Sequence, residues 1–179
     1  YGRAGARSSA PRRLSIASLV RAFVYRGGPV EALVSTIGDG HGWIVVNASS
    51  DVFLCERLPP SATLRDIRRY LTTELRQEIF GRAREIAGSW FRSLPPEAYV
   101  FEGMELLDFL LAQSHFVEVL DAVCFAERLV ELDAPQEIVL QGDGSPTVKA
   151  FCAVGARRGV KVQVQPTARE RTPPQRSRA

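Results

Sequence analysis

The residues best suited to chemistry are four consecutive ones, Gly142, Asp143, Gly144 and Ser145. Two glycines let the backbone approach a ligand closely. The carboxylate between them can accept hydrogen bonds from sugar hydroxyls, or take a proton from one. Asp143 is therefore the candidate catalytic residue, and Gly142, Gly144 and Ser145 are candidate substrate-binding residues.

The run begins as a dinucleotide-binding fingerprint does, but Thr147 stands where that fingerprint has its third glycine. Asp143 also places negative charge beside the amino end of the expected helix, where an anion would otherwise bind. Both features favour a hydroxyl-binding loop over a phosphate cradle. The structural alternative is that the glycines form a tight turn and that Asp143 or Ser145 caps the helix.

The flanking residues predict the elements that position this loop. Residues 138–140 are Ile, Val and Leu, which indicate a short buried strand. Ser145 as a cap and Pro146 in the first turn predict a helix that ends at Gly159. Alternating valines over residues 160–164 predict a second strand. Such a unit is nearly always a right-handed parallel crossover, and open α/β sheets bind ligands at the loop that follows a strand.

A second polar loop follows the β-branched run at residues 43–46, which indicates another buried strand. Asn47 and Ser49 in this loop are further candidate substrate-binding residues. The alternative is that these residues simply form a turn, because Asn and Ser favour turns through their own side-chain hydrogen bonds.

The remaining chain is rich in helical periodicity. Residues 14–25 fit a short helix or a strand, and residues 61–86 predict one long amphipathic helix that begins at Ser61. Residues 104–132 predict one buried helix, or two with a break near Ser114. The order of elements predicts an α/β fold, a Rossmann-like three-layer sandwich built on a mostly parallel sheet.

Length and charge define the expected domain organisation. The 179 residues are 45% hydrophobic, enough for one sizeable domain, which we place at residues 14–165. Residues 1–13 hold four Arg, and residues 166–179 hold four Arg and Glu170; both ends are expected to be disordered. The whole chain has 23 basic and 20 acidic residues. Of these, 15 basic and 19 acidic residues lie in residues 14–165, which gives the domain a net charge of about −4. Specific nucleic-acid binding is therefore not expected.

Cysteine, histidine and hydropathy patterns exclude several other classes. Cys55, Cys124 and Cys152 are odd in number and far apart, which argues against a disulfide framework. His41 and His115 have no partner at metal-ligand spacing, and His115 is expected to be a core residue. Neither a metal nor a cofactor is expected. The cysteine pattern makes a reduced, cytoplasmic location the expected one. The apolar runs are shorter than the roughly 20 residues of a membrane span.

Residues 99–165 resemble the N-terminal half of bacterial GT-B-like glycosyltransferases of surface-polysaccharide synthesis. The matching segments are Phe-Glu-Gly-Met-Glu-Leu-Leu from Phe101, Ile-Val-Leu-Gln-Gly-Asp-Gly-Ser-Pro from Ile138, and Val-Gln-Val-Gln from Val162. The resemblance implies a transferase reaction in which an acceptor hydroxyl attacks a nucleotide sugar, with an acidic residue as the base. Asp143 is the acidic residue that matches by position.

The chain departs from that family after its last expected strand. Members usually continue into Gln-His-Gly and a second Rossmann-like domain that binds the nucleotide sugar, whereas Gln165 is followed here by Pro166. The resemblance thus implies an acceptor-side domain that binds a sugar or nucleotide sugar and is inactive alone, or that needs a second polypeptide carrying the donor-binding domain. The alternative is a non-enzymatic α/β protein-interaction domain.

Overall fold

The computed structural model describes residues 19–89, 95, 100–101, 104–105, 109–142 and 144–166. The end segments expected over residues 1–13 and 166–179 fall outside these ranges, except for Pro166. Asp143 is also outside them.

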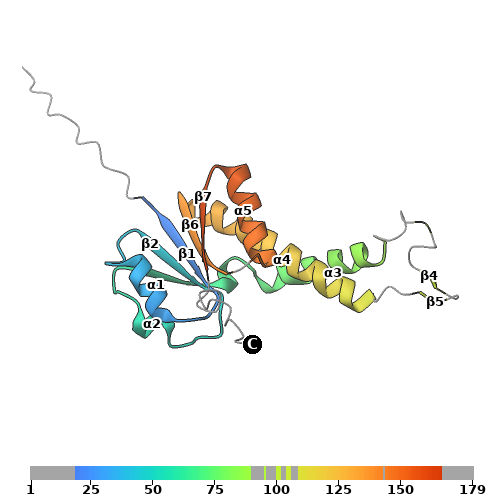
Figure 1. Ribbon diagram of the computed structural model, residues 1–179, viewed down its shortest axis with the longest axis horizontal. Helices are drawn as coiled ribbons and strands as arrows, with labels where there is room; N and C mark the ends of the chain where they lie inside the picture. Colours follow the sequence, from blue (N-terminus) through green and yellow to red (C-terminus); the bar gives the residue numbers. More distant parts are fainter. Residues whose placement is uncertain are drawn as a thin grey trace, which may run out of the picture.

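A five-stranded parallel sheet forms the centre of the molecule (Figure 1). Its spatial order is β3-β2-β1-β6-β7, and every neighbouring pair is parallel. The strands are β1 (Arg21–Tyr25), β2 (Trp43–Asn47), β3 (Thr63–Asp66), β6 (Glu137–Gln141) and β7 (Lys161–Gln165). The chain order runs outward in both directions from β1, so the topological switch point lies between β1 and β6. The expected α/β fold with a Rossmann-like sheet is confirmed.

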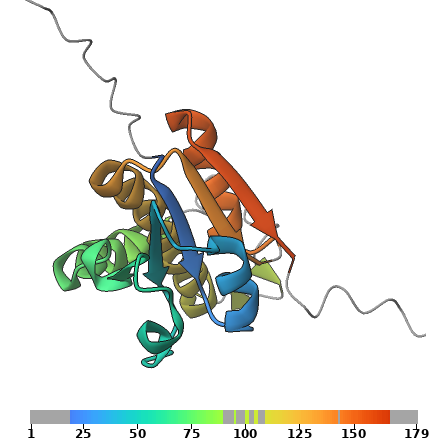
Figure 2. The same cartoon turned by 90° about the vertical axis from the view of Figure 1, so that its left-hand side faces the viewer.

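Helices cover both faces of this sheet (Figure 2). Two helices lie on one face and three on the other. The two core clusters show this division, since each joins its own set of helices to alternate residues of the strands. The first face carries α1 (Val30–Ile37) and α2 (Leu54–Arg57); the second carries α3 (Thr73–Ala87), α4 (Phe109–Asp133) and α5 (Pro146–Arg158). The result is the expected three-layer sandwich.

The alternation of β1 shows how the sheet holds the layers together. Ala22 and Val24 pack toward α3, α4 and α5, whereas Phe23 and Tyr25 pack toward α1 and α2. All four are buried, as is typical of the central strand of a sheet that is covered on both faces. On the three-helix face, Phe125 of α4 and Phe151 of α5 meet edge to face.

The long helix expected over residues 61–86 is wrong in its first half. Thr63–Asp66 form β3 at the edge of the sheet, and Ile67–Arg69 form a 3-10 turn. Helix α3 begins only after Thr72, whose hydroxyl oxygen accepts a hydrogen bond from the Leu75 N–H at 3.3 Å. Apolar residues three and four positions apart across this strand and turn imitate the periodicity of a helix. Pairing with β2 makes residues 63–66 a strand instead.

The predicted unit around residues 137–165 is confirmed. Strand β6, helix α5 and strand β7 follow one another, and β6 and β7 pair in parallel. Pro146 is the first residue of α5, and Gly159 ends it in the left-handed conformation at φ 71°. A side chain on Gly155 would collide with Val162 and lie 2.9 Å from the Val160 carbonyl oxygen, so this glycine permits close packing of α5 on β7.

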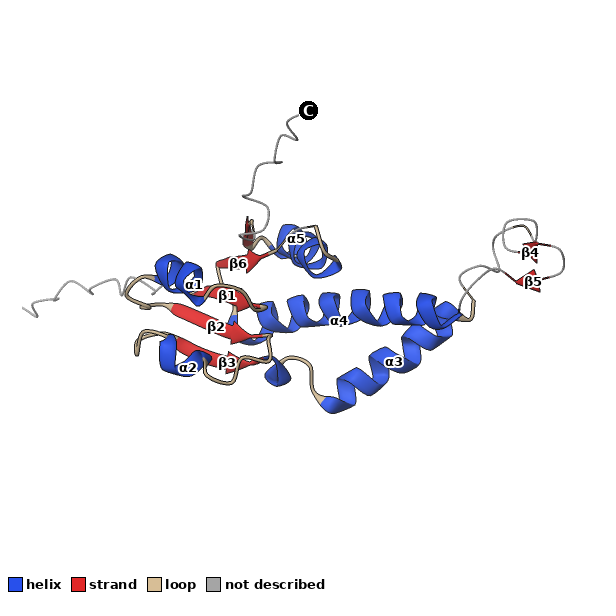
Figure 3. Cartoon of the chain, turned by 60° about the horizontal axis from the view of Figure 1, so that its bottom comes forward, coloured by secondary structure: helices blue, strands red, loops and turns tan. Residues whose placement is uncertain are grey.

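Helices α3 and α4 pack along each other and reach beyond the sheet (Figures 1 and 3). We call this pair, residues 73–87 and 109–133, the arm. Helix α4 continues through Ser114 without a break, which decides between the two expected arrangements. Two short antiparallel strands, β4 (Val100–Phe101) and β5 (Met104–Glu105), lie between them in the chain. In the described part of the chain, no helix has the length and apolar character that a membrane crossing requires.

Candidate functional site

The loops that follow β1 and β6 face each other at the carboxyl edge of the sheet. Strand β1 leads into α1 on one face, whereas β6 leads into α5 on the opposite face. The two loops therefore diverge from adjacent strands, which is the arrangement that creates a ligand-binding crevice in open α/β sheets. We call the place where residues 26–29 meet residues 141–142 and 144–145 the crevice.

Residues from each loop reach across to the other. Arg26 donates a hydrogen bond from Nη1 to Ser145 Oγ at 2.9 Å, and the same Nη1 lies 3.8 Å from where a methyl group on Gly142 would stand. In the other direction, Gln141 Oε1 lies 3.7 Å from where a methyl group on Gly28 would stand. A methyl group on Gly142 would also approach Val148 Cγ2 to 3.1 Å, so this position favours glycine.

A cavity of about 200 Å³ lies beside the crevice, between the carboxyl edge of the sheet and the base of the arm. Arg26 and Thr147 connect it to the crevice, because both residues line its wall. The other lining residues come from the strand ends, α3 and α4, and combine charged with apolar side chains: Ala48, Ile67, Leu71, Arg76, Glu118, Asp121, Ala122 and Phe125.

Among the residues that line this cavity, Asp121 has a carboxyl oxygen in an unusual environment. Its Oδ1 is buried and has no hydrogen-bond partner among the described residues. Burial raises the pKa of the Asp121 carboxyl above its ordinary value, while the positive charge of Arg76 acts in the opposite direction. A buried carboxylate oxygen without a donor is costly to maintain.

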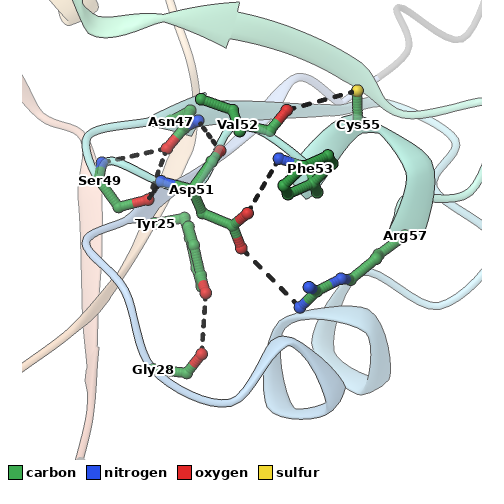
Figure 4. Close-up of polar contacts among 9 residues, drawn as sticks. All are labelled: Tyr25, Gly28, Asn47, Ser49, Asp51, Val52, Phe53, Cys55 and Arg57. Atoms are coloured by element: carbon green, nitrogen blue, oxygen red, sulfur yellow. Dashed lines mark hydrogen bonds and ion pairs between the residues drawn. The ribbon is translucent and has the colours of Figure 1, made fainter.

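The loop after β2 satisfies its own polar groups (Figure 4). Asn47 Nδ2 donates to the Asp51 carbonyl at 2.8 Å, and Asn47 Oδ1 accepts from both the N–H and the hydroxyl of Ser49. Ser49 Oγ in turn accepts from the Asp51 N–H at 3.1 Å. These contacts account for Asn47 and Ser49 as turn-forming residues, and their role in substrate binding stays a prediction.

The residues expected to form a site in the loop after β6 lie in different surroundings. Gly142 and Ser145 lie at the crevice, and Gly144 is exposed with no atom within 4 Å of its missing side chain. Ser145 stands at the cap position of α5, but its hydroxyl accepts from Arg26 and makes no cap hydrogen bond. Asp143, the candidate catalytic residue, lies outside the described residues.

Sequence reasoning missed Arg26, Gln141 and Asp121. The first could have been found from Gly27 and Gly28, since two glycines directly after a buried strand mark the first loop of a Rossmann-like sheet. Both glycines have positive φ, 100° and 111°. Asp121 carries a weaker signal, an acidic residue in a largely apolar stretch of helix that also holds Glu118.

The histidines and cysteines do not form a further site. His41 is exposed in its loop, and His115 is also exposed, so the expected core position of His115 is wrong. Burial raises the pKa of the Cys124 thiol, and the other two cysteines are exposed. The described ranges contain no cluster of His, Cys, Asp and Glu that could hold a metal ion.

Comparisons with protein-family models, with curated proteins and with solved structures found no significant match.

Proposed function

We propose that this domain binds a small hydroxyl-rich ligand of the sugar type at the carboxyl edge of its sheet, as the acceptor-side domain of a glycosyltransferase-like protein. The observation that carries the proposal is Asp121, an acidic residue that lines a cavity of about 200 Å³ and whose buried Oδ1 has no hydrogen-bond partner among the described residues. An ionised carboxylate accepts hydrogen bonds, and a few well-placed polar groups fix the orientation of a small ligand in a pocket.

The same carboxylate has the properties of a general base. Its raised pKa makes it a stronger proton acceptor than an ordinary Asp, and the charge of Arg76 opposes this rise and helps to keep it ionised. In the reaction, Asp121 takes the proton of an acceptor hydroxyl while that oxygen bonds to the anomeric carbon of a nucleotide sugar. The bond from this carbon to the phosphate breaks, and the nucleotide leaves with the electron pair. The donor is held by a second domain or polypeptide.

Titration calorimetry with a panel of neutral sugars, oligosaccharides and nucleotide sugars tests the proposal. We expect one class of hydroxyl-rich ligand to bind, and Asp121→Asn to weaken that binding by about tenfold or more, because a charge-assisted hydrogen bond becomes a neutral one. Glu131→Gln is the matched control, since Glu131 lies on the same helix but outside the cavity. A folded protein that binds no member of the panel would refute the proposal.

The arm supports a second candidate function, a non-enzymatic protein-interaction domain. A groove of about 710 Å³ runs between α3 and α4, with apolar Leu75, Ile79 and Leu120 among its lining residues. Phe80 on α3 is 55% exposed, although large apolar side chains are usually covered. If the arm recruits a partner, Phe80→Ser should abolish its capture while sugar binding at the cavity stays unchanged. Equal capture by both forms would exclude the arm as the contact.

A further inference from the structure

Strand β7 is the last strand at one edge of the sheet, and among the described residues it pairs only with β6 (Figure 2). The N–H of Lys161, its first residue, donates to the Gln136 carbonyl at 3.1 Å. Alternate residues of a strand direct their backbone groups to the same side. The backbone groups of Lys161 and of every second residue after it therefore face β6, whereas those of Val162 and Val164 face away from the sheet.

The outward backbone groups of Val162 and Val164 have no hydrogen-bond partner in the described part of the chain. The positions on either side cannot add a donor to this row. The Val160 N–H already donates to the Gly155 carbonyl at 2.9 Å, and Pro166 has no N–H. The edge therefore offers the N–H and C=O groups of these two valines, and such a row is a template for pairing with another strand.

The side chains of β7 leave this edge without the usual protection. Proteins commonly guard a free edge with a lysine or another charge. Lys161 is the only charged residue of β7, and its Nζ binds Glu137 Oε1 on the neighbouring strand at 2.7 Å. Gln163 donates to the same oxygen at 2.6 Å. Val164 is 41% exposed and lies on the same side of the strand as Val162, which packs against the core under α5.

The opposite edge of the sheet is guarded. Strand β3 has four residues, and two of them, Arg65 and Asp66, are charged. The chain passes from Asp66 directly into the 3-10 turn at residues 67–69. Charges and short length both disfavour the pairing of an edge strand with another chain. Of the two edges, β7 is therefore the one suited to pairing.

We infer that β7 pairs in antiparallel fashion with β7 of a second copy of this chain, about a two-fold axis at Gln163, so that the two sheets become continuous. In this register Val162 of each copy lies opposite Val164 of the other, and each such pair exchanges both of its hydrogen bonds. Every outward donor and acceptor of the two valines is then used in both copies. None of these residues lines the cavity at Asp121, so the pairing is separate from sugar binding.

The side chains of the two copies also match in this register. Val162 and Val164 of both copies form one apolar row on the face that α5 covers. On the other face Gln163 meets Gln163, and an amide can both donate and accept a hydrogen bond. Lys161 lies opposite Gln165, so no two like charges face each other across the pair.

Sedimentation velocity over a range of concentrations tests the pairing. We expect a reversible dimer, and Val164→Lys should raise its dissociation constant by about tenfold or more, because a charge enters the apolar row. Val52→Lys is the matched control, since Val52 is 75% exposed in the loop after β2 and should leave the dimer intact. A wild type that stays monomeric up to about 1 mM overturns the inference. A dimer that is unchanged in Val164→Lys does so as well.

Gln163 gives a test that does not depend on the folding of a single variant. Gln163→Lys and Gln163→Glu each place like charges opposite each other at the axis, so each variant alone should dimerise more weakly than the wild type. An equimolar mixture should form a heterodimer, because opposite charges then meet. Two folded variants that form no heterodimer would overturn this register.

Amide hydrogen exchange locates the contact. The N–H groups of Val162 and Val164 should exchange more slowly as the protein concentration rises, whereas those of Lys161 and Gln163 should be protected at every concentration by their bonds to β6. Phe80→Ser, on the arm, should dimerise as the wild type does. Loss of the dimer in Phe80→Ser, or exchange at Val162 and Val164 that does not depend on concentration, places the contact elsewhere and overturns the inference.

Discussion

Arg26 and Ser145 come from opposite sides of the switch point, and the hydrogen bond of 2.9 Å between them joins the loop after β1 to the loop after β6. The bond changes what Ser145 contributes to the fold. A serine in this position ordinarily accepts from an N–H of the first helical turn, but here its hydroxyl oxygen faces a guanidinium. Ser145 links two loops and makes no cap hydrogen bond to α5.

A pair of cap substitutions tests this difference. Thr72→Ala should lower the free energy of unfolding by about 1 kcal/mol, because Thr72 accepts from the Leu75 N–H at the start of α3. Ser145→Ala should cost at most about 0.5 kcal/mol, since it removes only an exposed bond. Denaturant unfolding of the two variants measures both values. Equal losses would mean that Ser145 does cap α5.

Two helical glycines should respond oppositely to the same change. Gly155→Ala should destabilise the protein by about 1 to 3 kcal/mol, because the new methyl group meets Val162 and the Val160 carbonyl oxygen. Gly81→Ala should stabilise it by about 0.5 to 1 kcal/mol, since no atom lies within 4 Å of that position on α3. Thermal unfolding gives the sign of each effect. A stable Gly155→Ala variant would contradict the close packing of α5 on β7.

Asp121 should make stability depend on pH. Its pKa in the folded protein is raised above the unfolded value by burial, so its ionisation disfavours the folded state. This penalty is absent below the unfolded pKa and fully present above the folded pKa. Asp121→Asn should therefore raise the free energy of unfolding at pH 7, with the gain disappearing as the pH falls below about 4.

The charged groups around Asp121 decide how large this effect is. Arg76 lines the same cavity, and its positive charge favours the ionised form of Asp121. Unfolding of the wild type and of Asp121→Asn at several pH values measures the contribution of this carboxylate. A variant that is less stable than the wild type at pH 7 would show that Asp121 makes a bond important for folding.

The phenol of Tyr70 is expected to be a strong contributor to stability. It donates a hydrogen bond to Asp133 Oδ2 at the end of α4, and Tyr70 is fully buried. Burial and the neighbouring carboxylate together raise the pKa of this phenol well above its ordinary value. Tyr70→Phe should cost about 1.5 to 3 kcal/mol, the range for bonds to charged groups.

Tyr25→Phe provides the comparison for Tyr70. Its hydroxyl donates to the neutral carbonyl of Gly28, so its loss should cost about 0.5 to 1.5 kcal/mol. A double-mutant cycle of Tyr70→Phe with Asp133→Asn measures the coupling directly. If the two changes have additive effects on the free energy of unfolding, the bond contributes nothing to stability.

Local signals explain which parts of the fold could be predicted from the sequence. Pro146 and Gly159 mark the two ends of α5 through backbone geometry alone, and both positions are confirmed. The edge strand β3 was missed because its conformation depends on pairing with β2, where Leu64 lies beside Val45. No spacing within residues 61–66 reports such a contact.

The candidate site was predictable only in part, for a similar reason. Gly142 and Ser145 were found because they sit in one turn, and turn residues have a local signature. Arg26 and Asp121 lie on different elements that only the folded sheet and arm bring to one cavity. The sequence shows neither the burial of Asp121 nor the direction of Arg26.

The arm should be less protected from amide hydrogen exchange than the sheet core. Helix α4 has 25 residues and spans about 37 Å, whereas five-residue strands span about 17 Å. Its second half, with Phe125, Ala126 and Leu129, packs into the sheet core, while its outer turns extend beyond that core along α3. Amide hydrogen exchange should therefore slow steadily along α4 toward Asp133, so that a single helix records both the local opening of the arm and the global unfolding of the domain.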